Sequence, residues 1–368
     1  MSFDEEVAPV LEVAGADAAS VDRDARFPDE AIGALRERGL LGLTLPDTVG
    51  GRGGTPTDFL AVTRALASRC ASTAMVFLMH TCAAQVTLAG ASSGDWEELR
   101  AMADGSNLTT LAFSERGSRS HFWAPVSQLV GSRLSAQKSF VTSAGHADSF
   151  VVSTRQAEAS TPLDSSLYLV PASVSGIEVG DAWQGLGLRG NASAPMTFDL
   201  EVSDTMLLGE AGKGLDTMLG VVLPWFALGS GAVSLGIAEG AMGAAVAHVT
   251  SAKLEHLGET LADLPTVRAR IGRAQTEVDT VAGFLADVAR RMEAADPLVP
   301  ILSAKASANE MAIRVTSEAM QACGGAAMSP TLPIERSFRD ARAGSVMAPT
   351  TDVLYELTGR ALAGMPLL

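Results

Sequence analysis

Cysteine is scarce in this sequence, and its pattern excludes the sites that cysteine commonly builds. Of 368 residues only three are cysteines, Cys70, Cys82 and Cys323, and they lie far apart with no CxxC spacing. An odd and scattered set provides neither a disulfide framework nor the paired ligands of a structural zinc site. We therefore expect a protein of a reducing compartment, with no structural metal.

Positive charge is also in short supply. Lys and Arg total 27 against 42 Asp and Glu, which gives a formal net charge of -15. Such acidity argues against a nucleic acid or an anionic membrane as the partner. The N-terminus carries Asp4, Glu5 and Glu6 where a secretory signal needs positive charge followed by an apolar run. We therefore expect a cytoplasmic protein.

Long uninterrupted hydrophobic runs are missing as well. The most apolar stretch, 214–247, contains Pro224 and many Gly and Ala residues, whereas a membrane span needs about 20 predominantly apolar residues. We interpret this stretch as a buried, tightly packed helix. Repeats, low-complexity tails and blocks of like charge are also lacking, which argues against a disordered interaction protein. The hydrophobic content of 47% predicts a large core divided among two or three domains.

The periodicity of the apolar residues divides the chain into three regions. Residues 1–107 have helical spacing, residues 108–212 consist of short apolar runs rich in β-branched residues, and residues 213–368 return to helical spacing. The predicted fold class is α+β, mainly α, with a helical N-terminal domain, a middle β domain and a C-terminal bundle. Strands are predicted at 149–153 and 166–170, and long Ala-rich helices at 227–252, 264–293 and 297–322.

Two segments of the predicted β domain combine small hydroxyl residues with an aromatic residue. Residues 111–120 include Ser114, and residues 138–144 include Phe140 and Thr142. Taken alone, the first segment is an ordinary polar hairpin. The second is equally a strand with Phe140 in the core and Thr142 as a β-former.

Further motifs follow in the C-terminal half and change that assessment. A glycine-rich segment at 185–193 precedes Gln321-Ala-Cys-Gly-Gly325 and a helix that contains Arg339-Asp340. In their order and spacing, these motifs resemble the acyl-CoA dehydrogenase family, and the resemblance runs from about Phe27 to Asp352. It implies a helical N-terminal domain, a middle β-barrel or sheet domain and a C-terminal four-helix bundle.

The resemblance also implies a flavin cofactor, FAD in preference to FMN. Ser114 takes a position that is usually Thr, beside main-chain donors that would hold the flavin ring. Phe140 would pack against that ring, and the Thr142 hydroxyl would reach flavin N5, the atom that accepts the hydride. Ser120 matches a serine of the flavin loop, whereas His121 replaces the family's usual Asp.

Contacts to the rest of the cofactor are implied near the C-terminus. Gln321, Gly324 and Gly325 would approach the dinucleotide part of FAD bound to a neighbouring subunit, because glycine lets a backbone come close. The protein is therefore expected to be a homodimer or homotetramer. Thr350 and Asp352 remain as further FAD contacts.

The family's catalytic base is missing. After Arg339-Asp340 the family commonly continues to Tyr-Glu-Gly-Thr, whose Glu removes the α-proton of an acyl thioester. This chain has Met347-Ala-Pro-Thr350, which places Ala348 at the Glu position, and no carboxylate occurs at 223–227 to replace it. Loss of a general base typically costs roughly 10²- to 10⁴-fold in rate. His121, and less so His80, are the remaining candidates because imidazole titrates near neutral pH.

Three functions follow from this reading. The first is an oxidoreductase acting on the CH–CH group of an acyl thioester, bound to CoA or to a carrier protein, with a relocated base or an unusually acidic substrate. The second is a flavin-dependent oxygenase, in which no such base is needed. The third is a non-catalytic flavin-binding or acyl-binding homologue, which the retained Thr142 and Ser114 disfavour. Neither a nucleic acid nor a membrane is expected as a partner.

Overall fold

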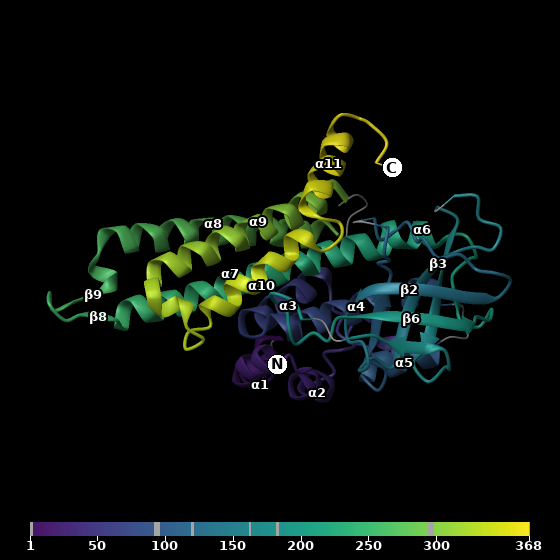
Figure 1. Ribbon diagram of the computed structural model, residues 1–368, viewed down its shortest axis with the longest axis horizontal. Helices are drawn as coiled ribbons and strands as arrows, with labels where there is room; N and C mark the ends of the chain where they lie inside the picture. The colour runs from purple at the N-terminus through teal and green to yellow at the C-terminus, as the bar shows by residue number, and fades with distance from the viewer. Residues whose placement is uncertain are drawn as a thin grey trace.

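The computed structural model describes residues 3–91, 96–118, 121–161, 163–181, 184–292 and 298–367. Two β-sheets lie at one end of an elongated molecule, and long helices extend to the other end (Figure 1). The order of elements is helical, then β, then helical, as the sequence predicted. The α+β, mainly α class is therefore confirmed.

The N-terminal helices begin and end at recognisable local signals. Thr55 and Asp58 form a capping box at the start of one helix, with Pro56 at its first position. Gly39 has a φ of +63° just beyond the end of another, the left-handed conformation that glycine adopts without strain. The elements of this region are α1 (Phe3–Asp24), α2 (Asp29–Glu37), the 3₁₀ turn η1 (Asp47–Val49), α3 (Pro56–Arg69), α4 (Ala71–Gly90) and α5 (Trp96–Asp104).

The middle region forms two sheets that enclose a small core. One sheet has the order β1-β3-β4-β7, with β1 parallel to β3, and the other has the order β2-β6-β5. Phe150 on β3 and Phe198 on β6 meet edge to face between them, with ring centroids 5.5 Å apart. The strands are β1 (Thr109–Ala112), β2 (Arg133–Val141), β3 (Ser149–Arg155), β4 (Ser165–Pro171), β5 (Ile177–Val179), β6 (Ala194–Glu201) and β7 (Leu207–Leu208).

The C-terminal region is a bundle in which α7, α8, α9 and α10 pack together. The three long helices predicted from the Ala-rich segments are present as α7, α8 and α9. The elements are α6 (Gly214–Thr217), the π-helical turn η2 (Met218–Val222), α7 (Leu223–Ser251), β8 (Lys253–Leu254), β9 (Glu259–Thr260), η3 (Leu261–Asp263), α8 (Pro265–Arg291), α9 (Leu298–Cys323), η4 (Gly324–Met328), α10 (Ile334–Val346) and α11 (Thr351–Leu362).

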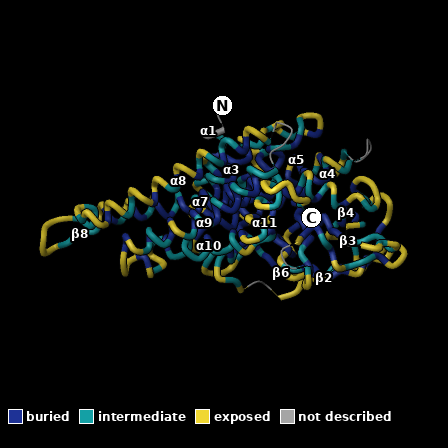
Figure 2. Tube along the Cα trace, turned by 90° about the horizontal axis from the view of Figure 1, so that it is seen from above, coloured by how far each residue is buried: buried dark blue, intermediate teal, exposed yellow. Residues whose placement is uncertain are grey.

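The most apolar helices lie inside the molecule. Two stretches, Ala71–Gly90 and Gly214–Ser251, are long and apolar enough to cross a membrane, but 83% of the tested window of each is buried within the protein. Figure 2 shows this buried interior running along the bundle, with exposed residues on its outer turns. The apolar stretch at 214–247 is therefore a core element, as predicted.

The three regions are joined at one point on α10. Arg339 donates to both carboxylate oxygens of Asp22 on α1, at 2.9 and 2.6 Å, and to the carbonyl of Leu186 at 3.0 Å. Its neighbour Asp340 accepts a 2.7 Å hydrogen bond from the backbone N–H of Leu188. Two consecutive side chains thus connect the N-terminal helices, the loop between β5 and β6, and the bundle.

Close packing of α7 on α3 requires glycine at position 236. A Cβ atom there would lie 2.2 Å from the carbonyl oxygen of Arg64 and 2.7 Å from Cβ of Ala67, both on α3. Because a helix backbone cannot yield cheaply, we expect Gly236→Ala to lower the free energy of unfolding by about 1–3 kcal/mol. Gly243→Ala on the same helix is the control, since nothing lies within 4 Å there. Urea unfolding of both variants tests this, and equal effects would contradict it.

Asp340 should make stability fall as the pH rises. Burial raises the pKa of its carboxyl to about 6, although the Leu188 N–H bond opposes the shift. The native state then binds more protons than the unfolded chain between about pH 4 and 6, so its stability decreases across that window. Relative to Asp340→Asn, which keeps an oxygen acceptor, the wild type should lose up to ~3 kcal/mol between these pH values. Unfolding curves that show a pH-independent difference between the two proteins would contradict this.

Candidate functional site

A cavity of about 840 Å³ lies where the three regions meet. Its walls come from α4, from the segments after β1 and at the end of β2, from the loop at 186–193, from α7, and from α10 with the residues that follow it. Ser114, Phe140, Thr142 and Ala348, which lie far apart in the sequence, all line it. The fold therefore brings together four of the positions that the sequence singled out.

A bulge in β2 shapes the polar wall of the cavity. The register of β2 on β6 shifts between Lys138 and Val141, and Phe140 within the bulge has a φ of +55°. This is an unusual conformation for an aromatic residue, and such strain is concentrated at functional sites. It leaves the Phe140 side chain 60% exposed. Bulges re-aim side chains, and here Thr142 beyond the bulge lines the cavity.

The loop at 186–193 forms the adjoining wall. The Thr142 hydroxyl lies 3.4 Å from the Ser193 hydroxyl, and the backbone N–H of Ser143 donates to the carbonyl of Asn191 at 3.0 Å. Gly190 fits tightly against α1, because a Cβ atom there would lie 2.1 Å from Cγ1 of Val21. The glycines of this loop thus allow the close packing that holds Asn191 and Ser193 at the cavity.

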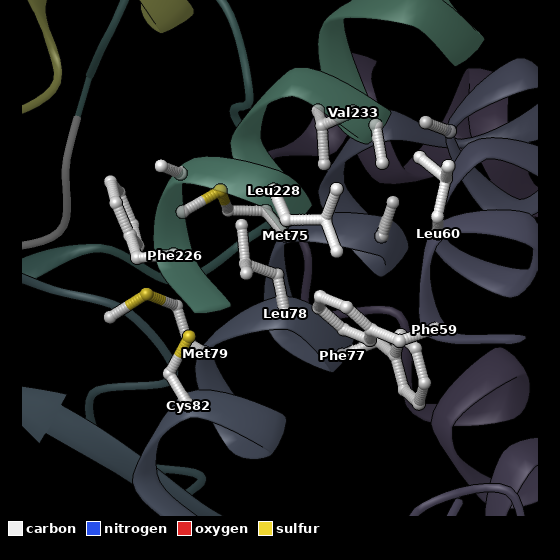
Figure 3. Close-up of a cluster of buried hydrophobic side chains, with 14 of the residues drawn as sticks. Phe59, Leu60, Met75, Phe77, Leu78, Met79, Cys82, Phe226, Leu228 and Val233 are labelled. Atoms are coloured by element: carbon white, nitrogen blue, oxygen red, sulfur yellow. The ribbon is translucent and has the colours of Figure 1, made fainter. Parts of the chain in front are cut away.

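Another part of the cavity lining is apolar. Met75 and Met79 are one turn apart on α4, and Phe226 comes from α7 (Figure 3). Figure 3 shows that these three side chains lie at one edge of a larger buried cluster that includes Leu78 and Leu228. Flexible methionine side chains adapt to irregular apolar ligands. This wall therefore suits a hydrocarbon group.

The cavity contains one carboxylate among its described lining residues, and that carboxylate is engaged. Glu115 accepts hydrogen bonds from the Lys138 ammonium, from the Ser127 hydroxyl and from the backbone N–H groups of Val126 and Ser127. Burial alone would raise the pKa of Glu115, but the Lys138 charge and these hydrogen bonds hold it below its usual value. Glu115 is therefore a buried ion-pair partner and a poor proton acceptor.

The histidines proposed as bases lie elsewhere. His121 lines a second cavity of about 690 Å³, together with Asp352 on α11. His80 is fully buried in α4, and its Nδ1 accepts a hydrogen bond from the backbone N–H of Thr109 at 3.2 Å. Burial lowers the pKa of His80 to about 4, so it stays neutral at physiological pH. Neither histidine belongs to the wall that holds Thr142.

The remaining predicted cofactor contacts are placed as follows. Gln321 lies in the last turn of α9, and Gly324 and Gly325 begin η4. All three are exposed and outside both cavity linings. Thr350 is the residue that precedes α11. Ser120 lies outside the described residues. The contacts predicted between Gln321, Gly324 and Gly325 and the FAD of a neighbouring subunit therefore stay a prediction.

Several cavity residues were not identified from the sequence. Met75 and Met79 were overlooked because an i, i+4 apolar pair is typical of any core helix. Asn191 and Ser193 lie in a segment that we interpreted mainly as architecture, although polar residues in a glycine-rich loop are a signal for ligand contact.

The cavity fits the flavin that the resemblance implies. A flavin ring system is flat, with a polar pyrimidine edge and an apolar benzenoid edge, and the cavity lining offers both hydroxyl groups and the apolar side chains of Met and Phe. Ser114, Phe140 and Thr142 would hold the ring, with Asn191 and Ser193 beside them. The volume leaves room for part of a second ligand, since small-molecule sites commonly measure about 300–1,000 Å³.

Comparison with known proteins agrees with this reading along nearly the whole chain. The N-terminal, middle and C-terminal domains of acyl-CoA dehydrogenase match residues 3–106, 110–200 and 212–363. Cyclohex-1-ene-1-carbonyl-CoA dehydrogenase of Syntrophus aciditrophicus is 28% identical over 354 residues, which are 94% of this chain and 85% of the relative.

Solved structures share the fold. Butyryl-CoA dehydrogenase from Megasphaera elsdenii superposes with a TM-score of 0.90 at 22% identity, over 99% of each chain. Dibenzothiophene monooxygenase TdsC from Paenibacillus sp. A11-2 gives a TM-score of 0.87 at 21% identity, over 99% of this chain and 98% of TdsC, and another TdsC structure contains FMN. The chain belongs to the acyl-CoA dehydrogenase family and is a flavin-dependent oxidoreductase, with FAD as the family's cofactor.

Proposed function

We propose that the protein oxidises the α,β carbon–carbon bond of an acyl thioester, carried by CoA or by a carrier protein. The supporting observation is the cavity itself, whose lining combines the apolar side chains of Met75, Met79 and Phe226 with the hydroxyl groups of Ser114 and Thr142. An acyl chain placed on the apolar wall would lie against a flavin held by the polar wall. Bound FAD supplies a hydride acceptor in this arrangement.

The residues of the chain orient the ligands and exclude water. Thr142 is 3% exposed, so its hydroxyl is shielded and fixed near Ser193. Preorganised hydroxyl and backbone dipoles act strongly in such a dry site because they need not reorient. Met75 and Met79 are both buried and shield the apolar part of the cavity from solvent.

For removal of the substrate's α-proton, the described cavity lining contains no unengaged carboxylate that could act as the base. Ala348 lines the cavity with a methyl group, and Glu115 is already bound to Lys138. We therefore propose a substrate whose α-hydrogen is unusually acidic. We also propose that Ser120, Thr350 and Asp352 contact FAD, that Gln321, Gly324 and Gly325 reach the FAD of a neighbouring subunit, and that the protein is a cytoplasmic homodimer or homotetramer.

A flavin-dependent oxygenase is the second candidate. The same observation favours it, because an oxygenase needs no carboxylate to remove an α-proton, and the described lining of this cavity offers none that is unengaged. The fold of the monooxygenase TdsC is compatible with this reading. The two candidates differ in whether an acyl thioester alone reduces the flavin.

An anaerobic titration distinguishes the two functions. The purified holoenzyme is mixed with a panel of acyl-CoA and acyl-carrier thioesters, and the visible absorption of the flavin is followed. We expect one thioester to bleach the flavin and to yield the α,β-unsaturated product. Flavin that resists every thioester, together with O₂ uptake and an oxygenated product once a reductant is added, would replace the proposal with the oxygenase.

Restoring a carboxylate at position 348 tests the missing-base interpretation directly. Because Ala348 lines the cavity, the side chain in Ala348→Glu has access to the ligand space. We expect the rate of flavin reduction by a simple saturated acyl-CoA to rise by roughly 10²- to 10⁴-fold, the usual contribution of a general base. Ala348→Gln is the matched control, with the same shape and no basic group. An equal rate in both variants, measured by stopped-flow absorbance, would show that position 348 does not face the α-carbon.

A further inference from the structure

A fully buried lysine lies behind the cavity wall at position 348. Lys305 on α9 is 0% exposed, and its Nζ donates to the carbonyl of Met347 at 3.0 Å and to that of Pro349 at 2.7 Å. These two residues flank Ala348, and both Met347 and Ala348 line the cavity. One amine therefore holds both ends of the segment that replaces the family's catalytic loop.

The same amine also contacts a second wall of the cavity. Nζ lies 5.6 Å from the centroid of the Phe226 ring, which is the distance range of a cation–π contact. Phe226 comes from α7 and lines the cavity on its apolar side. Lys305 thus connects the segment at 347–349 to the wall on which the acyl group would rest.

Within the described part of the chain, no carboxylate forms an ion pair with the buried Lys305 amine. Burial alone lowers the pKa of its amine to about 7, and no ionisable neighbour on α7, α10 or α11 contributes to the shift. Burying an amine is costly, and an apolar side chain of similar size would fill the space more favourably. A purely structural requirement does not explain a lysine here, whereas a need to fix two carbonyl groups does.

Lys305 belongs to a short row of polar groups on α9. Asn309, one turn further along, donates to the carbonyl of Gly344 at 2.9 Å and accepts from the Ser234 hydroxyl at 3.0 Å. Asn309 thus fixes the last turns of α10, and Lys305 fixes the segment that follows. The two sets of hydrogen bonds are separable, because among the described residues those of Ser234 and Asn309 go to each other and to Gly344, whereas those of Lys305 go to Met347 and Pro349.

We propose that Lys305 is a positioning residue that sets the shape of the ligand cavity by fixing Met347 and Pro349 around Ala348. Through the same amine it keeps this segment in register with Phe226. The part of this proposal that concerns an acyl thioester depends on the proposed function, whereas the part that concerns the geometry of the segment does not.

Hydrogen–deuterium exchange of the holoenzyme tests the geometric part. Lys305→Met removes the donors and keeps the length of the side chain, and Ser234→Ala is the matched control because it removes one buried hydrogen bond next to Asn309. We expect the backbone amides of Val346, Met347, Ala348 and Thr350 to exchange about 10-fold faster in Lys305→Met, in line with the loss of the two hydrogen bonds from Nζ, and to be unchanged in Ser234→Ala. Equal exchange in Lys305→Met and wild type would overturn the proposal.

Ligand readouts separate positioning from general destabilisation. In Lys305→Met we expect an altered visible spectrum of the bound flavin, and about 10-fold weaker binding of a thioester that perturbs the wild-type spectrum, by the same energetic argument. Should that variant fail to fold, Lys305→Gln, which retains one amide donor, is expected to show both effects in smaller measure. Unchanged spectra and affinity in a folded variant would overturn the proposal. Indifference of the wild type to every thioester would contradict the proposed function and leave the exchange result as the test of Lys305.

Discussion

The pairing of Arg339 and Asp340 with two distant segments, α1 and the loop at 186–188, is the constraint on which the site depends. Arg339 binds Asp22 of α1 and the carbonyl of Leu186, and Asp340 binds the N–H of Leu188. Asp22 and Glu335 raise the pKa of Arg339 above its usual value, so the guanidinium stays charged. One hydrophobic core cluster extends through all three regions, and these directional polar links fix the loop at 186–188 and α1 against α10, beside the cavity.

The cavity lining contains both the residues that we propose as flavin contacts and the position at which the family's Glu is replaced. Thr142, Ser114 and the strained Phe140 are the proposed flavin contacts. Ala348 also lines the cavity, between the two residues whose carbonyl groups bind the Lys305 amine. A chain that had lost its function would have little reason to keep a bulge and a left-handed aromatic residue, since backbone strain of this kind costs of order 1–3 kcal/mol. The geometry therefore favours an active flavoenzyme whose substrate has an unusually acidic α-hydrogen.

The two buried lysines near the cavity, Lys138 and Lys305, differ in the groups that surround their amines. Lys138 is fully buried but meets Glu115 and the Ser153 backbone, so its charge is compensated and both groups are fixed. Lys305 is equally buried and meets carbonyl groups and one aromatic ring. The first arrangement stabilises the sheet region and removes Glu115 from acid–base chemistry. The second makes the segment at 347–349 depend on a single amine.

The sequence by itself determined the elements and the local motifs. Helical periodicity, the Thr55–Asp58 capping box and the Gly39 stop are local effects, so α2, α3, α7, α8 and α9 could be predicted. Phe140 and Thr142, which line the cavity, were singled out by the resemblance of their motif to the acyl-CoA dehydrogenase family. Our division at 107/108 and 212/213 stays an interpretation, beside family domains that match 3–106, 110–200 and 212–363.

Only the tertiary structure decided which of these residues face one another. Met75 and Met79 have the spacing of core residues, and periodicity cannot tell a helix face that meets a neighbour from one that meets a cavity. His80 and His121 looked alike as bases until packing buried one and placed the other in a second cavity. Lys305 gave no signal, because the cost and the use of a buried amine arise only from the carbonyl groups that the fold places around it.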